Sequence, residues 1–193
     1  LFALESGDSI DKFDFVGFTL QYEMSYTNVL NMLDLGNIPL FAKDRKGFEY
    51  PIVVAGGPCA FNAEPLADFV DIFFLGEGEE VDLEVIDLYK EYKAKGGNDK
   101  GEFLKLAAQI EGVYVPSLYD VQYDEEGKIV SYTAKDGAPE IVHKRIMKDM
   151  DKSYFPDKVV MPYIETVQDR IMLEVYRGCI RGCRFCQAGI IYR

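Results

Sequence analysis

The sequence predicts an α/β domain with a parallel sheet and helices on both of its faces, the doubly wound arrangement. Two observations carry this prediction. Short apolar segments typical of buried strands alternate with longer amphipathic segments typical of helices, and the strand segments run into glycine-containing loops. Because neighbouring parallel strands need a crossover between them, this alternation indicates βαβ units rather than hairpins.

The predicted elements follow one another along the first 95 residues. Strands are expected at 13–20 (FDFVGFTL), 51–55 (PIVVA) and 71–75 (DIFFL), with helices at 22–35, 63–70 and 79–95. Three strands are fewer than a stable sheet normally has. The chain also lacks an initiating Met. We therefore expect either that earlier strands precede Leu1 in a longer protein, or that the segment after Lys100 completes the sheet.

The rest of the chain is predicted to form a β-rich connector and the start of another domain. The connector is expected to contain a helix at 102–110, a hairpin at 117–133 and an extended strand at 141–148. A last strand at 171–176 runs into the cysteines, and a helix is expected to begin within 183–192. These boundaries give an α/β domain at 1–97, a connector at 98–169 and a third region at 170–193.

Composition excludes several classes of protein. The 193 residues are 48% apolar and 28% charged, which is an ordinary globular composition. No apolar run reaches the roughly 18 residues of a membrane-spanning helix, and the N-terminus does not resemble a signal peptide. We expect a cytoplasmic protein without a membrane partner. The net charge of −12 argues against nucleic-acid binding through this part of the chain.

Three of the four cysteines fall within eight residues. Cys179, Cys183 and Cys186 form a C-x3-C-x2-C pattern. Three thiolates on one loop can hold three irons of a 4Fe-4S cluster and leave the fourth iron open to another ligand. The loop also carries basic and flexible residues suited to an anionic cluster, namely Arg177, Arg181, Arg184, Gly178 and Gly182. The pattern therefore predicts a metal site at the three cysteines.

This cysteine spacing resembles that of the radical S-adenosylmethionine (SAM) superfamily. The likeness covers about residues 171–193, with Phe185 before the third cysteine and a predicted strand before the first. It implies that the open iron chelates SAM, that electron transfer cleaves SAM to a 5′-deoxyadenosyl radical, and that the loop follows the first strand of a partial barrel. It also implies an external electron donor such as flavodoxin or ferredoxin.

Other metal sites fit the pattern less well. A structural zinc site takes four ligands, and His143 or Cys59 would have to supply the fourth from far along the chain. Three unrelated structural cysteines within eight residues are less expected still. Cys59 itself is predicted to be a small buried thiol.

Glycine-containing loops follow all three predicted strands. Since ligands of parallel α/β sheets sit at the carboxyl ends of the strands, these loops are predicted to line one crevice. Strand-to-helix turns need glycine in any case, so a single such loop is weak evidence for a ligand site. The three loops together are more informative. The candidate cofactor-binding residues are Thr19, Gly56, Gly57, Gly76, Glu77 and Gly78.

The segment Phe13–Lys95 resembles the cobalamin-binding-type, Rossmann-like domain that precedes many radical SAM cores. The likeness rests on the GGP turn and on AEPLADFVDIFFLGEGEE. It implies cobalamin as a further cofactor. The D-x-H-x-x-G motif that supplies an axial histidine in such domains does not occur, and the one histidine, His143, lies outside the α/β segment. Either the motif lies before Leu1, or cobalamin binds without a protein histidine, or the domain is a vestigial relative. Cobalamin is expected to bind this chain by itself weakly or not at all.

Three functions follow from these resemblances. The first is a radical SAM enzyme that reductively cleaves SAM, with cobalamin-assisted methyl or group transfer as the implied subclass. The second is a radical methylthiotransferase, against which the lack of three further cysteines counts. The third is a non-catalytic metal- or ligand-binding module. The first is favoured, with this chain as the front part of the enzyme and inactive by itself.

Overall fold

The computed structural model describes residues 1–158, 163–165, 167, 170 and 172–192. The chain separates into two compact units, Leu1–Ile146 and Met147–Arg193. We call the first unit the body and the second the cysteine segment, and each is described by itself.

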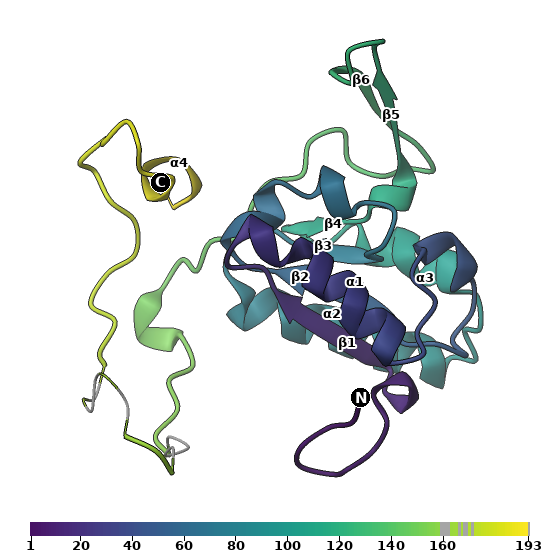
Figure 1. Ribbon diagram of the computed structural model, residues 1–193, viewed down its shortest axis with the longest axis horizontal. Helices are drawn as coiled ribbons and strands as arrows, with labels where there is room; N and C mark the ends of the chain where they lie inside the picture. Colours follow the sequence, from purple (N-terminus) through teal and green to yellow (C-terminus); the bar gives the residue numbers. More distant parts are fainter. Residues whose placement is uncertain (159–162, 166, 168–169, 171, 193) are drawn as a thin grey trace. The chain divides into compact units, whose positions relative to one another are not determined.

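A four-stranded sheet forms the centre of the body (Figure 1). Its strands are β1 (Phe15–Thr19), β2 (Ile52–Gly56), β3 (Ile72–Phe74) and β4 (Val113–Tyr114), in that order across the sheet. The first three strands are parallel, and β4 pairs antiparallel with β3. The predicted α/β domain with a parallel sheet is thus confirmed, and β4 supplies the extra strand expected from the segment after Lys100.

Helices pack on both faces of this sheet. Figure 1 shows α1 (Tyr26–Leu35) in front of the sheet and α2 (Gly78–Ala94) behind it, with α3 (Lys100–Ala107) following α2 in the chain. Asp99 caps α3 by accepting the N–H of Glu102 at 3.1 Å. Short 3-10 turns connect the elements of the body at Ile10–Lys12, Glu23–Ser25, Ala42–Asp44, Pro58–Phe61, Glu64–Leu66 and Pro116–Leu118.

The core lies between the sheet and these helices. The central strands are buried on both faces, and Ile52, Val53, Ile72 and Phe73 are fully enclosed. This explains why β2 and β3 read as continuous apolar runs and do not alternate with polar residues. Helix α1 contributes Val29 and Leu33, and α2 contributes Val81 and Val85. Each such side chain stabilises the fold by about 1.5–3 kcal/mol through its removal from water.

A two-stranded hairpin follows the sheet. Its strands are β5 (Tyr119–Tyr123) and β6 (Ile129–Ala134), which pair antiparallel with an irregularity between Gln122 and Tyr123. Figure 1 shows this hairpin extending from the body. The hairpin predicted at 117–133 is therefore confirmed.

Three predicted elements are wrong. The helix expected at 63–70 is only the 3-10 turn Glu64–Leu66, because the backbone N–H groups of Leu66, Ala67 and Phe69 donate to carbonyls three residues back. Residues 141–148 contribute a single bridge, between Arg145 and Gly76, in place of a strand. Residues 172–176 form no strand, and Ile171 lies outside the described residues. Apolar character predicted a strand there, but a strand also needs a pairing partner.

The cysteine segment contains little regular structure among its described residues. It has a 3-10 turn at Met150–Lys152 and the short helix α4 (Ala188–Ile191), which confirms the helix expected to begin within 183–192. Within the described parts of both units, no helix combines the length and apolar character that crossing a membrane requires.

Candidate cofactor crevice and cysteine loop

The carboxyl ends of β1, β2 and β3 open into one crevice with a volume of about 330 Å³. The register places Thr19 beside Gly56, so the loops leaving the parallel strands start at the same edge of the sheet. Of the six predicted cofactor-binding residues, five line this crevice: Thr19, Gly56, Gly57, Gly76 and Gly78. Glu77 occupies the N-cap position of α2 between Gly76 and Gly78, and its side chain makes no capping hydrogen bond. The strand-end crevice that the sequence predicts is therefore present.

Glycine is required at two places in the crevice wall. Gly57 has φ +95°, and a Cβ there would lie 2.9 Å from the carbonyl oxygen of Leu20. Gly76 has φ +110°, and a Cβ there would overlap the backbone of Arg145. Both positions demand the left-handed region that L side chains rarely adopt. The glycines thus allow neighbouring backbone to close over the strand ends.

Arg145 ties the connector to the rim of the crevice. Its backbone N–H donates to the carbonyl of Leu75 at 2.8 Å, and its carbonyl accepts the N–H of Glu77 at 3.0 Å. Its guanidinium donates to the carboxylates of Glu80 and Glu84 on α2 at 2.7 Å each. These hydrogen bonds raise the pKa of Arg145. Sequence reasoning missed this residue, because Glu80 and Glu84 stand among other acidic residues of α2 and nothing local marks them as its partners.

The electrostatic character of the crevice is acidic. Asp82 lines it, and partial burial, followed by the charge of Glu79, raises the pKa of Asp82. Among the described residues that line the crevice there is no lysine, arginine or histidine. A ligand in the crevice would therefore meet backbone, the Thr19 hydroxyl and a carboxyl group. This wall suits hydroxyl and amide groups better than a free phosphate.

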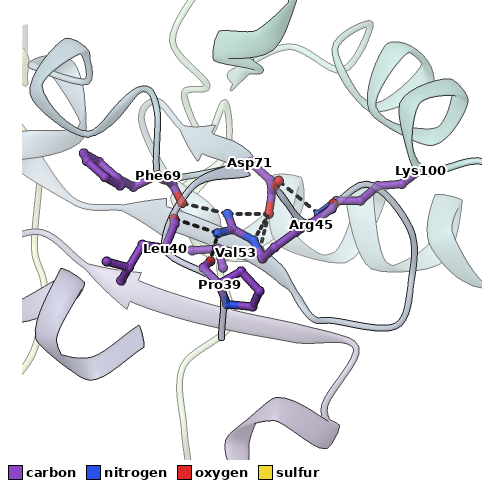
Figure 2. A network of polar contacts seen from close by, with 7 residues as sticks. All are labelled: Pro39, Leu40, Arg45, Val53, Phe69, Asp71 and Lys100. Carbon is purple, nitrogen blue, oxygen red and sulfur yellow. Dashed lines mark hydrogen bonds and ion pairs between the residues drawn. The ribbon is translucent and has the colours of Figure 1, made fainter. Parts of the chain in front are cut away.

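A buried ion-pair network fixes the opposite ends of the same strands (Figure 2). Asp71, just before β3, accepts the N–H of Val53 at 2.8 Å. Its carboxylate also pairs with Arg45 at 3.1 Å and with Lys100 at 3.0 Å. All three charged side chains are buried, and burial lowers the pKa of Lys100.

The remaining donors of the Arg45 guanidinium bond to backbone carbonyls. They reach Leu40 at 2.8 Å and Phe69 at 2.7 Å, and Figure 2 shows the Pro39 carbonyl as a further acceptor. The network therefore joins the loop before β2, the start of β3 and the start of α3. Sequence reasoning missed it, although Asp71 next to the apolar run IFF was a signal for a paired buried charge.

The cysteine loop is built differently from the crevice. Cys179 and Cys183 are exposed, Cys186 is half-buried, and all three are free thiols. The N–H of Cys186 donates to the carbonyl of Cys183 at 3.2 Å, which places the two in one turn. Among the described residues, no three His, Cys, Asp or Glu side chains are gathered in a metal-ligating arrangement.

The residues of the loop nevertheless fit an iron–sulfur cluster. Three reduced, accessible thiols lie within eight residues, and Gly178 and Gly182 have φ of +85° and +67°, so the backbone can turn sharply between them. Arg177 pairs with Glu174 at 2.8 Å, and this pairing lowers the pKa of Glu174. Arg181 and Arg184 add positive charge close to the thiols.

Comparison with known proteins supplies the family. Residues 1–116 match the family described as radical SAM proteins, N-terminal. The chain belongs to the radical SAM family. Its amino-terminal match contains the sheet and the crevice and ends before the three cysteines. The cysteine spacing and the family match therefore point to the same family from different parts of the chain.

A longer relative of this radical SAM protein is also found. An uncharacterized protein of Methanocaldococcus jannaschii is 32% identical over 196 residues, which is 100% of this chain and 34% of that protein. The chain thus spans about a third of the length of this relative. No solved structure matches the chain.

Proposed function

We propose that the full-length protein is a radical SAM enzyme and that this chain carries its cluster-binding cysteines. The observation that carries the proposal is the presence, in one chain, of the radical SAM N-terminal region at residues 1–116 and the C-x3-C-x2-C pattern beyond it. When bound, a 4Fe-4S cluster would supply the electron that cleaves a C–S bond of SAM, and an external flavodoxin or ferredoxin would supply that electron to the cluster.

The residues of this chain have distinct tasks in the proposal. Cys179, Cys183 and Cys186 would hold a bound 4Fe-4S cluster as thiolates, and the absence of a fourth cysteine in this pattern would leave one iron for SAM. Gly178 and Gly182 have positive φ, and this freedom would let the loop turn until the three sulfurs faced one centre. Arg181 and Arg184 offset the negative charge of the thiolates and the cluster. Cys59 takes no part, because it is buried in the body and burial raises the pKa of its thiol.

Alanine variants of the cysteines in the full-length protein test this function. After anaerobic reconstitution and reduction, the unmodified protein is expected to convert SAM to 5′-deoxyadenosine. Cys179→Ala, Cys183→Ala and Cys186→Ala are each expected to abolish this product. Cys59→Ala is the matched control, which is expected to keep its iron and its activity and to cost about 1 kcal/mol of folding stability.

Two outcomes would contradict the assignment. If the three loop variants form 5′-deoxyadenosine at the unmodified rate, the radical chemistry does not depend on this loop. If Cys59→Ala alone removes the cluster, a fourth protein ligand exists and no iron is open to SAM. The protein would then be an electron carrier or a metal-binding module.

We also propose cobalamin-assisted methyl or other group transfer as the reaction class. The support is the resemblance of Phe13–Lys95 to cobalamin-binding-type domains, together with the glycine-lined crevice at the strand ends. No histidine lines this crevice among the described residues, so cobalamin would bind there without a protein axial ligand from this chain.

Titration of the full-length protein, followed by the visible spectrum of cobalamin, tests this class. Gly17→Val is a suitable variant, because Gly17 lines the crevice and a Cβ there makes only an ordinary contact with Val54. Cobalamin binding that Gly17→Val removes supports the proposal. Unchanged binding in Gly17→Val, or no binding by the unmodified protein, eliminates a corrinoid in this crevice.

A further inference from the structure

The β5–β6 hairpin has two chemically distinct faces. Strand pairing places Tyr119 opposite Ala134, Val121 opposite Tyr132, and Tyr123 opposite Ile129. Directly opposed residues share a face, so Tyr119, Val121, Tyr132 and Ala134 lie on one apolar face. Tyr123 and Ile129 continue this face beyond the irregularity, where the register skips Val130. The other face carries Asp120, Gln122, Ser131 and Thr133. This alternation of apolar and polar side chains is typical of an antiparallel sheet that buries one face and exposes the other to solvent.

Only the base of the apolar face is covered within the body. Tyr119 is buried and stacks on Tyr132 with ring centroids 4.9 Å apart, and it also contacts Tyr114 at 5.1 Å. Toward the turn the face opens to solvent, where Tyr123 is 52% exposed and Ile129 is 51% exposed. The outer half of the hairpin therefore presents apolar side chains without a covering element among the described residues of the body.

Hydrogen bonds hold this face in a fixed direction. The hydroxyl of Tyr123 donates to Glu64 at 3.1 Å, and that of Tyr119 donates to the carbonyl of Pro139 at 2.8 Å. Tyr119, Val121 and Tyr123 line one wall of a groove of about 780 Å³, which Asp68 and Lys100 line from other elements. The hairpin is thus anchored at its base and along its inner edge, while its outer apolar surface stays open.

An isolated two-stranded hairpin is only marginally stable in water and gains stability when its apolar face is packed. Clustered exposed aromatic and aliphatic side chains commonly mark an interaction surface. The turn at the end of this hairpin carries Asp124, Glu125 and Glu126 against a single Lys128. A partner for this surface would therefore have an apolar centre and a basic margin.

We propose that the outer apolar face of the hairpin docks a part of the full-length protein that lies outside these 193 residues. The homologous relative contains this whole chain within 34% of its length, so about two-thirds of that protein is available to form such a contact. The docked surface is an intramolecular interface that holds the body against the rest of the enzyme. The inference does not depend on SAM cleavage and fails or holds independently of it.

Hydroxyl-radical footprinting of the full-length protein, read by mass spectrometry, tests the docking without any substitution. Tyr22 is the internal reference, because it is 63% exposed in the body and lies on another loop. Tyr123 is expected to label several-fold more slowly than Tyr22 in the monomeric full-length protein. Equal labelling of the two tyrosines would overturn the proposal. Protection that disappears on dilution would also overturn it, since a second copy would then be the occupant. Equal protection of Tyr123 in the 193-residue chain alone would overturn it as well, since residues 147–193 would then be the occupant.

A pair of charge substitutions supplies the second measurement. Ile129→Asp places a carboxylate on the apolar face, whereas Gln122→Asp places one on the opposite face of the same hairpin. In the full-length protein, Ile129→Asp is expected to raise the labelling of Tyr123 to that of Tyr22, and Gln122→Asp is expected to leave Tyr123 protected. The same response to both substitutions would show that the apolar face is not the docked one.

Discussion

The body and the cysteine segment differ in how completely each buries its own apolar side chains. The body encloses its central strands and pairs its buried charges. In the described part of the cysteine segment, most large apolar side chains stay exposed, among them Met172, Leu173, Val175, Tyr176, Ile180 and Phe185. An apolar residue is buried only where another surface meets it. The crevice is therefore enclosed by packed residues of the body, whereas the described residues around the three cysteines are mostly exposed.

The largest expected change in the stability of the body comes from Asp71→Asn. The change leaves Arg45 and Lys100 as two buried cations without their carboxylate, which is expected to destabilise the body by about 3–5 kcal/mol. Denaturant unfolding of the chain measures this cost. Asp87→Asn is the control, because it breaks an exposed pair with Lys90 and is expected to cost about 0–1 kcal/mol. Similar costs for the two substitutions would show that the buried network does not hold the body together.

The sequence predicted the sheet because the local pattern and the packed structure agree there. Residues 52–56 and 72–74 are apolar in sequence and are buried on both faces in the structure, so the apolar runs alone indicated strands. The carboxyl-end crevice followed from the same parallel arrangement.

The sequence could not predict features that depend on distant partners. Arg45 and Lys100 meet Asp71 from 26 and 29 positions away, and nothing local marks either one as buried. Residues 172–176 have strand composition without a pairing partner among the described residues. The spacing of the three cysteines indicates a metal site. The local sequence does not determine how their sulfur atoms would come together around one centre. Local propensity is overridden wherever tertiary contacts decide.

The second-largest expected change is a loss of stability when the connector is separated from the rim of the crevice. Gly76→Ala meets both backbone strain and overlap with Arg145, whereas Gly96→Ala meets only strain, because no atom lies within 4 Å of the added Cβ. Strain alone is expected to cost about 1–2 kcal/mol, and the overlap in Gly76→Ala about 1–3 kcal/mol more.

Denaturant unfolding together with amide hydrogen exchange checks this difference. Faster exchange at Arg145 and Glu77 in Gly76→Ala, but not in Gly96→Ala, is the expected sign that the connector has separated from the rim. If both variants lose the same unfolding free energy and show the same exchange rates, the connector is not fixed to the crevice rim. This part of the body would then be as little packed as the cysteine segment.

The smallest expected effect is a loss of stability of the body at alkaline pH, caused by ionisation of the Tyr26 hydroxyl. Burial raises the pKa of Tyr26 from 10.0 to about 12, and its hydroxyl donates to the carbonyls of Cys59 at 2.8 Å and Asn62 at 3.1 Å. Because the folded state holds this proton more tightly, its stabilising contribution is complete below pH 10 and is lost as the pH rises from 10 toward 12. At the middle of this window the loss is expected to be about 1 kcal/mol.

Tyr26→Phe separates this contribution from other alkaline effects. The variant is expected to be less stable than the unmodified chain by about 1 kcal/mol at neutral pH, because the carbonyls of Cys59 and Asn62 each lose one hydrogen bond. Since the variant cannot ionise at this position, the difference in unfolding free energy should shrink above pH 10, vanish near the middle of the window and reverse in sign toward pH 12. Urea unfolding at a series of pH values measures it. A difference that stays constant across this window would mean that the Tyr26 hydroxyl is not held in the core, and that the body is less fully packed around its crevice than the comparison with the cysteine segment requires.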